Sequence, residues 1–174
     1  MPKIIDNARE LILAEARRLA LSDSYEGLTM RAVASACGMS VGTVYNYFDS
    51  KETLTASFML EDWERIASAA ETDTALCADA SQALFRIYSA LGEFLEIYRP
   101  LFASTGAEKV YSVGVKSYHA LIISRLSAMF APFSVGAPDP AFLASFAAEA
   151  LVTWTMRGAD FADMEPLFKR LFAQ

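Results

Sequence analysis

The chain has 174 residues, of which 54% are hydrophobic, and its formal net charge is -6. This composition supplies a buried core for one or two small domains and excludes an intrinsically disordered chain. Cys37 and Cys77 are the only cysteines, so we expect no disulfide scaffold and a reducing, cytoplasmic location. We expect neither a signal peptide nor a membrane anchor. Charged residues interrupt the N-terminal aliphatics, and the most apolar run, residues 140–156, is short for a bilayer span and contains Glu149.

An amphipathic helix is predicted near the N-terminus, followed by a loop. Apolar residues recur there at helical spacing. Residues 22–28 contain Ser, Asp and Gly and are typical of a connection between helices. The face of the predicted helix is formed by Ile5, Ala8, Ile12, Ala16 and Leu19.

Two short helices joined by a tight turn are predicted next. Thr29 can cap a helix over residues 30–37, and Gly38 can adopt the left-handed backbone that ends it. Ser40 can cap a second helix over residues 41–47, whose early Gly42 lets another surface come close. Apolar residues at 33, 39 and 44 point into the angle between the two helices. The pattern predicts a helix-turn-helix with an exposed second helix.

This segment is similar to a known family. TMRAVASACGM followed by SVGTVYNYFDSKETL resembles the DNA-binding segment of TetR-type transcriptional regulators, and the resemblance covers roughly the first third of the chain. It implies an all-α fold in which a three-helix DNA-binding head with a helix-turn-helix, residues 1–50, precedes a helical ligand-binding and dimerisation body, residues 51–174. The alternative for the segment is a tyrosine-rich helical hairpin that only packs.

Roles on DNA follow from position and from the resemblance. Val41 and Thr43, at the start of the second helix, are placed to read base edges in the major groove. By resemblance, Arg31 reaches a base or a phosphate, whereas family members often carry Lys where this chain has Val41. The resemblance also gives Tyr45, Tyr47 and Lys51 phosphate contacts, the alternatives being that Tyr45 packs in the head and Lys51 is solvated. The predicted DNA-binding residues are Thr29, Arg31, Ser40, Val41, Gly42, Thr43, Tyr45, Asn46, Tyr47 and Lys51.

The charge distribution limits the electrostatic attraction between the head and DNA. Residues 1–60 carry six basic and seven acidic side chains, so the head is nearly neutral. Non-specific attraction to phosphates should therefore be weak. We expect affinity to come from local geometry, helix N-termini and paired binding units.

A long helix is predicted directly after the head. Asp49 and Glu52 form a variant of a capping box at its start, and it remains amphipathic to residue 70. Residues 71–79 are polar and non-periodic, which predicts a connection. A further helix with a stripe from Leu84 to Tyr98 is expected to end before Pro100, and another extends over residues 111–129 until prolines and a glycine end it.

The last two helices predict a subunit interface. The run over residues 142–156 is apolar on nearly every face, and one protomer can hardly cover all of it. With the final helix, and with the same pair from a second chain, it would form a four-helix bundle, similar to the TetR-type dimer interface. The predicted interface residues are Phe142, Phe146, Ala147, Ala150, Leu151, Trp154, Leu167, Phe168 and Leu171.

Candidate ligand contacts are few, and nothing indicates catalysis. The single histidine has no neighbouring Cys or His, so we predict no metal site, no cofactor and no enzyme activity. Aromatic residues along the body helices either line a cavity for a small apolar or aromatic effector or form plain core. These candidates are Phe85, Tyr88, Tyr98, Tyr111, Tyr118 and His119.

The prediction is a cytoplasmic homodimer that binds a double-stranded DNA operator, acts as a repressor and is released by a small-molecule effector. The alternative is a helical small-molecule carrier or enzyme with a vestigial helix-turn-helix head. Sequence-specific DNA binding separates the two, because a carrier should show none.

Overall fold

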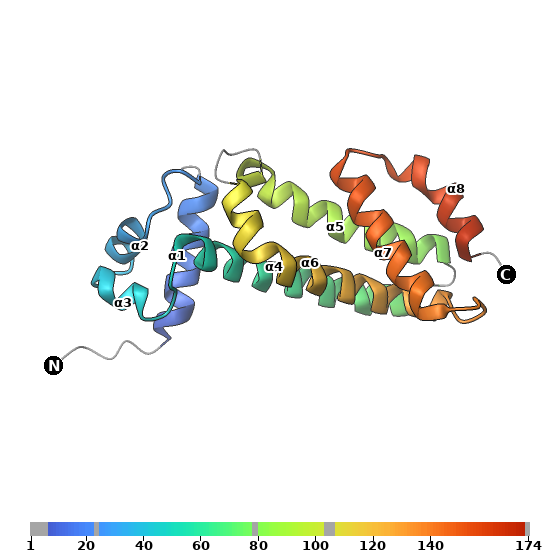
Figure 1. The fold of residues 1–174 in the computed structure, drawn as a ribbon, viewed down its shortest axis with the longest axis horizontal. Coiled ribbons are helices and arrows are strands. Elements are labelled where there is room, and N and C mark those ends of the chain that lie inside the picture. Colours follow the sequence, from blue (N-terminus) through green and yellow to red (C-terminus); the bar gives the residue numbers. More distant parts are fainter. Residues whose placement is uncertain (1–6, 23–24, 78–79, 103–106, 173–174) are drawn as a thin grey trace. The chain divides into compact units, whose positions relative to one another are not determined.

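The computed structural model describes the backbone of residues 7–22, 25–77, 80–102 and 107–172, and the side chains of these residues except 80, 102 and 107–118. In these ranges the chain forms helices and no strands, so the predicted all-α fold is confirmed (Figure 1). The elements are α1 (Ala8–Ser22), α2 (Met30–Ala36), α3 (Val41–Tyr45), α4 (Lys51–Ala75), α5 (Ala80–Phe102), α6 (Ala107–Phe130), the 3₁₀ helix η1 (Ala131–Phe133), α7 (Pro140–Met156) and α8 (Phe161–Phe172).

The chain divides into two compact units. The first comprises Met1–Glu61 with Ile97–Tyr118, and the second comprises Asp62–Glu96 with His119–Gln174. The chain passes from one unit to the other inside α4, α5 and α6. The first unit thus includes the opening turns of α4 as well as the helix-turn-helix. The functional division predicted at residue 50 stays a prediction.

The first unit is built on α1, α2 and α3, which lie together in Figure 1. The apolar periodicity of α1 places Ile12, Leu13 and Ala16 in the core. Ile5, expected on the same face, lies outside the described residues, and α1 continues three residues past Leu19 to Ser22. From the other two helices, Val33, Ala34 and Val44 are fully or almost fully buried against this core.

The start and end of α4 differ from the predictions. Ser50, not Asp49, caps the helix: its hydroxyl oxygen accepts the backbone N–H of Thr53 at 3.0 Å. Residues 71–75, predicted as a connection, belong to α4. Thr74 is buried there, and its hydroxyl donates to the Ala70 carbonyl at 2.6 Å, so this polar side chain has a hydrogen-bond partner within the helix.

Helix α5 does not end before Pro100. It continues to Phe102 with Pro100 inside its last turns. A proline there removes one backbone hydrogen bond, while Tyr98 and Leu101 on either side are buried and hold the turn in place. Tertiary packing outweighs the local signal at this position.

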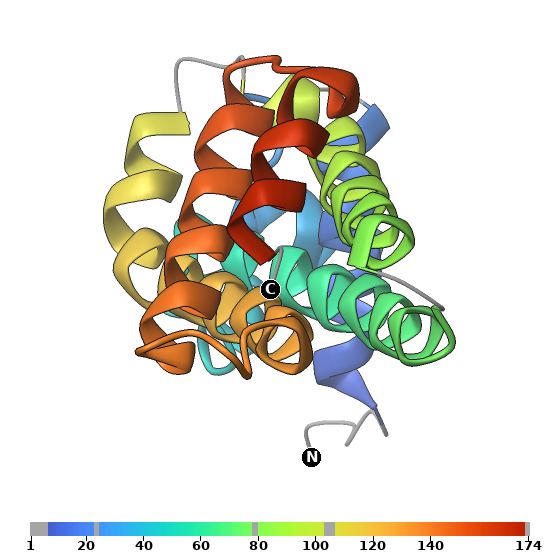
Figure 2. The same ribbon diagram turned by 90° about the vertical axis from the view of Figure 1, so that its right-hand side faces the viewer.

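The second unit contains the distal part of α4 together with α7 and α8, which lie side by side (Figure 2). The rings of Phe94 on α5 and Trp63 on α4 pack in a T-shaped arrangement, with ring centroids 5.5 Å apart. Asp139 caps α7 by accepting the Phe142 N–H at 3.0 Å, and Pro140 occupies the first turn, where it needs no donor. Gly158, with φ of 82°, ends α7. Among the described residues, no helix is long and apolar enough to cross a membrane.

Candidate nucleic-acid interface

The turn between α2 and α3 is closed by the residues that the sequence predicted. Thr29 has extended backbone angles, and its hydroxyl oxygen accepts the Ala32 N–H at 3.0 Å. Gly38 has φ of 63°, and the following N–H of Met39 donates to the Ala34 carbonyl at 2.9 Å. An added Cβ at Gly38 would meet nothing within 4 Å, so glycine is favoured there by the backbone angle alone. The caps and the turn predicted from local residue types are therefore present.

Ser40 organises the start of α3. Its hydroxyl oxygen accepts the Thr43 N–H at 3.1 Å, and the two hydroxyl oxygens are 2.8 Å apart. A Cβ added at Gly42 would contact only the Ser40 hydroxyl, at 3.8 Å, so the space beside this turn is open. The helix ends at Tyr45, two residues earlier than predicted, and the N–H of Asn46, its C-cap, donates to the carbonyls of Gly42 and Thr43.

One side of α3 and its C-terminal extension is buried and the other is exposed. Val44 and Phe48 face the core, at 0% and 4% exposure. Tyr45 and Tyr47 are 50% and 48% exposed, and Asn46 is exposed between them. Two half-exposed phenols and an amide thus stand on the outer side of a short helix. Arg31 of α2 is also exposed, and Val41 and Thr43 are partly exposed at the start of α3.

Lys51 is placed differently from the other predicted DNA contacts. Its ammonium donates a hydrogen bond to the Tyr25 carbonyl and lies 3.7 Å from the centroid of the Tyr25 ring. Burial lowers the pKa of the Lys51 ammonium. Lys51 is nevertheless partly exposed, so its predicted phosphate contact and the alternative of a solvated residue both stay predictions.

Two arginine contacts that sequence reasoning missed brace these helices. In the first unit, Arg9 of α1 forms an ion pair with Glu61 of α4 at 2.9 Å and lies 5.7 Å from the centroid of the Phe48 ring. The partners are 52 residues apart, so no local pattern could have indicated the pair.

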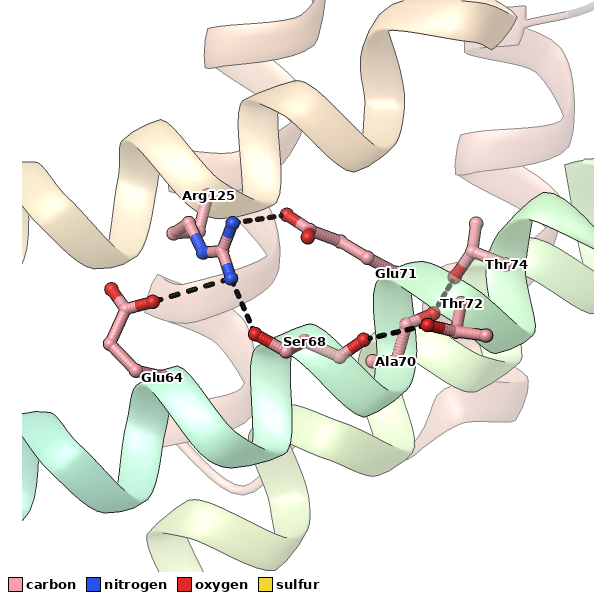
Figure 3. A network of polar contacts seen from close by, with 7 residues as sticks. All are labelled: Glu64, Ser68, Ala70, Glu71, Thr72, Thr74 and Arg125. Carbon is pink, nitrogen blue, oxygen red and sulfur yellow. Dashed lines mark hydrogen bonds and ion pairs between the residues drawn. The ribbon is translucent and has the colours of Figure 1, made fainter.

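In the second unit, Arg125 of α6 joins two successive turns of α4 (Figure 3). It contacts Glu71 at 2.8 Å, the Ser68 hydroxyl at 2.8 Å and Glu64 at 3.3 Å. The three partners all lie on one face of α4, since they are spaced by three and four residues. The spacing of these three residues on α4 is visible in the sequence, but no sequence pattern indicates that Arg125 contacts them.

The predicted ligand-contacting residues do not gather around one described cavity. Tyr98 is fully buried and stacks on Phe58 with centroids 6.1 Å apart, so it is core. Phe85 and Tyr88 both contact the ring of Phe161 on α8. Phe85 also lines an open groove of about 530 Å³.

The remaining ligand candidates divide into one described residue and two outside the description. His119 is exposed and pairs with Glu149 of α7 at 3.2 Å. The side chains of Tyr111 and Tyr118 lie outside the described residues. No group of His, Cys, Asp and Glu among the described residues has the arrangement of a metal site.

The predicted interface residues fall into two groups. Ala147 and Leu151 are completely buried, so the protomer itself covers these two and a partner cannot touch them directly, whereas Phe168, 5% exposed, lies at the floor of the groove described below. This corrects their assignment: α7 is apolar all round, and its alanine face packs inward. Four large side chains remain exposed, at 68%, 52%, 51% and 66%: Phe142, Phe146, Trp154 and Leu167. Together with partly exposed Ala150 and Leu171, three of them line a groove of about 440 Å³ between α7 and α8.

The helix-turn-helix is similar in sequence to known proteins. Residues 12–57 match the sequence model described as "Bacterial regulatory proteins, tetR family". The HTH-type transcriptional repressor KstR of Rhodococcus jostii (strain RHA1) is 43% identical over 60 residues, which are 34% of this chain and 28% of that protein. The matched part thus spans less than a third of the first curated relatives.

Solved structures resemble the fold over almost the whole chain. The regulator SCO7518 of Streptomyces coelicolor A3(2) has a TM-score of 0.66 at 16% identity, with 95% of this chain and 98% of that chain covered. The TetR-family repressor AlkX of Dietzia sp. strain DQ12-45-1b, implicated in biodegradation of n-alkanes, has a TM-score of 0.62 at 17% identity, with 95% and 97% covered. At these identities the likeness concerns the fold alone.

Proposed function

We propose that this chain, whose residues 12–57 match the sequence model of the tetR family of bacterial regulatory proteins, is a homodimeric transcriptional repressor that binds an operator in double-stranded DNA. The curated relatives are transcriptional regulators, and this chain too would act by binding rather than by catalysis. We place this activity in the cytoplasm.

The observation that carries the proposal is the capped, half-exposed α3. Val44, with Phe48 just after the helix, holds α3 on the core, while Tyr45 and the following Asn46 and Tyr47 stand outward. A short helix with its N-terminus open at Gly42 can enter a major groove and present Val41 and Thr43 to base edges. Tyrosine hydroxyls and the α3 N-terminus then hold phosphates without needing a basic patch.

Dimerisation supplies the second half of the operator contact. The exposed side chains of Phe142, Phe146, Trp154 and Leu167 form an apolar face on α7 and α8, of a kind that monomers rarely leave in water. A two-fold pairing of this face would present two α3 helices to successive major grooves, about 34 Å apart.

We propose that a small apolar or aromatic effector binds the second unit and releases the DNA. Helix α4 begins four residues after Tyr47 and continues into the second unit, so a shift of α4 there is carried toward α3. A differential affinity of about 1 to 3 kcal/mol between the two states is enough for such control. Among the predicted contacts, Phe85 and Tyr88 beside Phe161 remain candidates, and Tyr98 is excluded because it is core.

The decisive experiment is selection of duplexes from a random-sequence DNA pool by the full chain, followed by a gel shift. A selected site with two related half-sites, about one helical turn apart, is the expected result. A chain that enriches no sequence would sink the proposal and favour the helical carrier or enzyme with a vestigial head.

A further inference from the structure

The outer side of α3 and of the residues around it carries no positive charge. Residues 38–50, all of which the structure describes, contain no Arg, Lys or His. In the major groove, guanine is read most often by the paired donors of an arginine or a lysine. The side chains that this segment exposes are instead an aliphatic group, a hydroxyl, two phenols and an amide: Val41, Thr43, Tyr45, Asn46 and Tyr47. Such a set is better suited to an A·T pair than to a G·C pair.

Val41 is the aliphatic member of this set, and a base edge can come close to it. It is the first residue of α3, directly after the capping Ser40, and it is partly exposed. The next residue, Gly42, has no side chain, and a Cβ built there would meet only the Ser40 hydroxyl, at 3.8 Å. The space beside Val41 is therefore open to a surface that approaches α3.

The hydroxyl groups at the start of α3 already have partners within the protein. The Ser40 hydroxyl oxygen accepts the Thr43 N–H at 3.1 Å and lies 2.8 Å from the Thr43 hydroxyl oxygen. Val41 has no hydrogen bond to exchange, and its side chain gains free energy by covering apolar surface. Among the groups that the base pairs present in the major groove, the methyl group is the C5 methyl of thymine.

We propose that Val41 covers the C5 methyl of one thymine in each operator half-site and thereby specifies an A·T pair at that position. The inference rests on the proposed DNA-binding function and names a base that the site reads. Burial of one methyl group corresponds to about a fourfold gain in affinity for each half-site.

The test removes single methyl groups from the DNA. It uses the full chain and the duplex that the wild type selects from random-sequence DNA. Each thymine, with its counterpart in the other half-site, is replaced by deoxyuridine, which keeps the hydrogen-bonding groups of thymine and lacks only the C5 methyl. We expect one such pair of replacements to weaken binding about fifteenfold, as the product of two half-sites. A duplex in which no thymine methyl matters overturns the proposal.

Val41→Ala shows which side chain covers the methyl. This variant should bind the thymine duplex more weakly than the wild type, and the deoxyuridine replacement should change its affinity by no more than about twofold. Arg31→Met is the matched control, because Arg31 is exposed on α2, outside α3. Its loss should weaken binding and leave the effect of the missing methyl unchanged. Equal sensitivity to deoxyuridine in the wild type and in Val41→Ala overturns the proposal, since another group then covers the methyl.

5-Methylcytosine separates contact with the methyl from changes in DNA shape. A C·G pair at the sensitive position lacks the methyl, and 5-methylcytosine restores it without restoring the hydrogen-bonding groups of thymine. The wild type should bind the 5-methylcytosine duplex about fifteenfold more tightly than the cytosine duplex, whereas Val41→Ala should bind the two almost equally. No difference in the wild type would assign the deoxyuridine effect to DNA deformability and would overturn the proposal.

Failure of the proposed function looks different. A wild-type chain that selects no duplex refutes DNA binding and, with it, the role of Val41. A selected duplex that tolerates deoxyuridine at every position refutes only the role of Val41 and leaves DNA binding intact. Circular dichroism checks that Val41→Ala is folded. If it is not, the deoxyuridine and 5-methylcytosine series on the wild type decide, because they need no variant.

Discussion

At the scale of single residues, the helix-turn-helix separates residues that shape it from residues that face outward. Thr29, Gly38 and Ser40 fix the ends of two short helices through side-chain caps and one left-handed backbone angle. Thr43 belongs to both groups. Its backbone N–H donates to the Ser40 hydroxyl in the helix cap, and its side chain remains partly exposed.

Thr43 is expected to influence which sequence is bound. Thr43→Ala removes the hydroxyl and should change the enriched sequence, at an affinity cost of about 1 to 3 kcal/mol for the wild-type site. Thr43→Ser, which keeps the hydroxyl that lies 2.8 Å from the Ser40 hydroxyl, is the matched control. Duplex selection with each variant is the measurement, and identical enriched sequences for wild type and Thr43→Ala would contradict the assignment.

Tyr25 is expected to make the protein sensitive to alkali. Burial, and then the neighbouring carboxylate of Glu52, raise the pKa of Tyr25 to about 12 from the model-compound value of 10.0. The pKa of Tyr25 is higher in the folded than in the unfolded state. The stability that the neutral Tyr25 phenol contributes is therefore complete below about pH 10 and is lost as the pH rises toward 12. Tyr25→Phe should flatten the fall of the unfolding free energy between these pH values. Burial lowers the pKa of Lys51, so Lys51 changes the unfolding free energy with pH in the opposite direction. Measuring Tyr25→Phe in the Lys51→Met background therefore gives the effect of the tyrosine alone.

Local signals explain which of these residues the sequence could predict. Caps and a left-handed glycine depend on neighbours within three or four residues, so Thr29, Gly38 and Ser40 were predicted correctly. The position of the Lys51 ammonium depends on Tyr25, 26 residues away, and no spacing rule connects them. The ion pair of Arg9 with Glu61 was missed for the same reason.

At the scale of helices, Arg125 holds α6 to the distal part of α4 through three partners on one face (Figure 3). Such a guanidinium gains more than an isolated surface pair, because several hydrogen bonds share one ordered side chain. The contact matters for the proposed switch, since α4 is the helix that continues from this unit to the start of the helix-turn-helix.

Arg125→Met is expected to lower the free energy of unfolding by about 1 to 2 kcal/mol. Arg18→Met is the matched control: Arg18 is exposed on α1 and pairs with Glu15 at 2.9 Å, so its loss should cost no more than about 0.5 kcal/mol. Urea unfolding of both variants is the measurement. Equal effects would show that the network adds nothing to a single surface pair.

The element scale also explains two wrong boundaries. Polar composition over residues 71–75 suggested a connection, and Pro100 suggested a helix end, yet buried Thr74, Tyr98 and Leu101 keep both segments helical. In α7 the difficulty was different. Its sequence is apolar on nearly every face, so periodicity could not separate inward-facing Ala147 from outward-facing Phe146.

At the scale of the whole molecule, the exposed face of α7 and α8 predicts the oligomeric state. Phe146→Asp places a charge on a half-exposed position of that face and should yield folded monomers that no longer bind the operator. Leu76→Asp, at an 82% exposed position outside the face, is the control and should leave the dimer intact. Light scattering measures both, and a wild-type monomer would refute the interface.

Ala147→Glu should behave differently from Phe146→Asp. Ala147 is fully buried in the protomer, so the new carboxylate has no partner and the protomer itself loses stability, by about 3 kcal/mol or more. Thermal unfolding followed by circular dichroism separates this outcome from simple dissociation. A stable, monomeric Ala147→Glu variant would mean that α7 is turned the other way.

The withdrawal of Lys51 onto Tyr25 has a consequence for how the protein would be distributed in a cell. Between residues 25 and 51 the only other basic residue is Arg31, so the surface offered to DNA carries little positive charge. Because few basic side chains would neutralise phosphates, binding would release few counterions from the DNA. Non-specific binding to DNA of arbitrary sequence should therefore be weak. Most copies would then diffuse freely instead of sliding along DNA, and occupancy of the proposed operator would change little when the ionic strength rises.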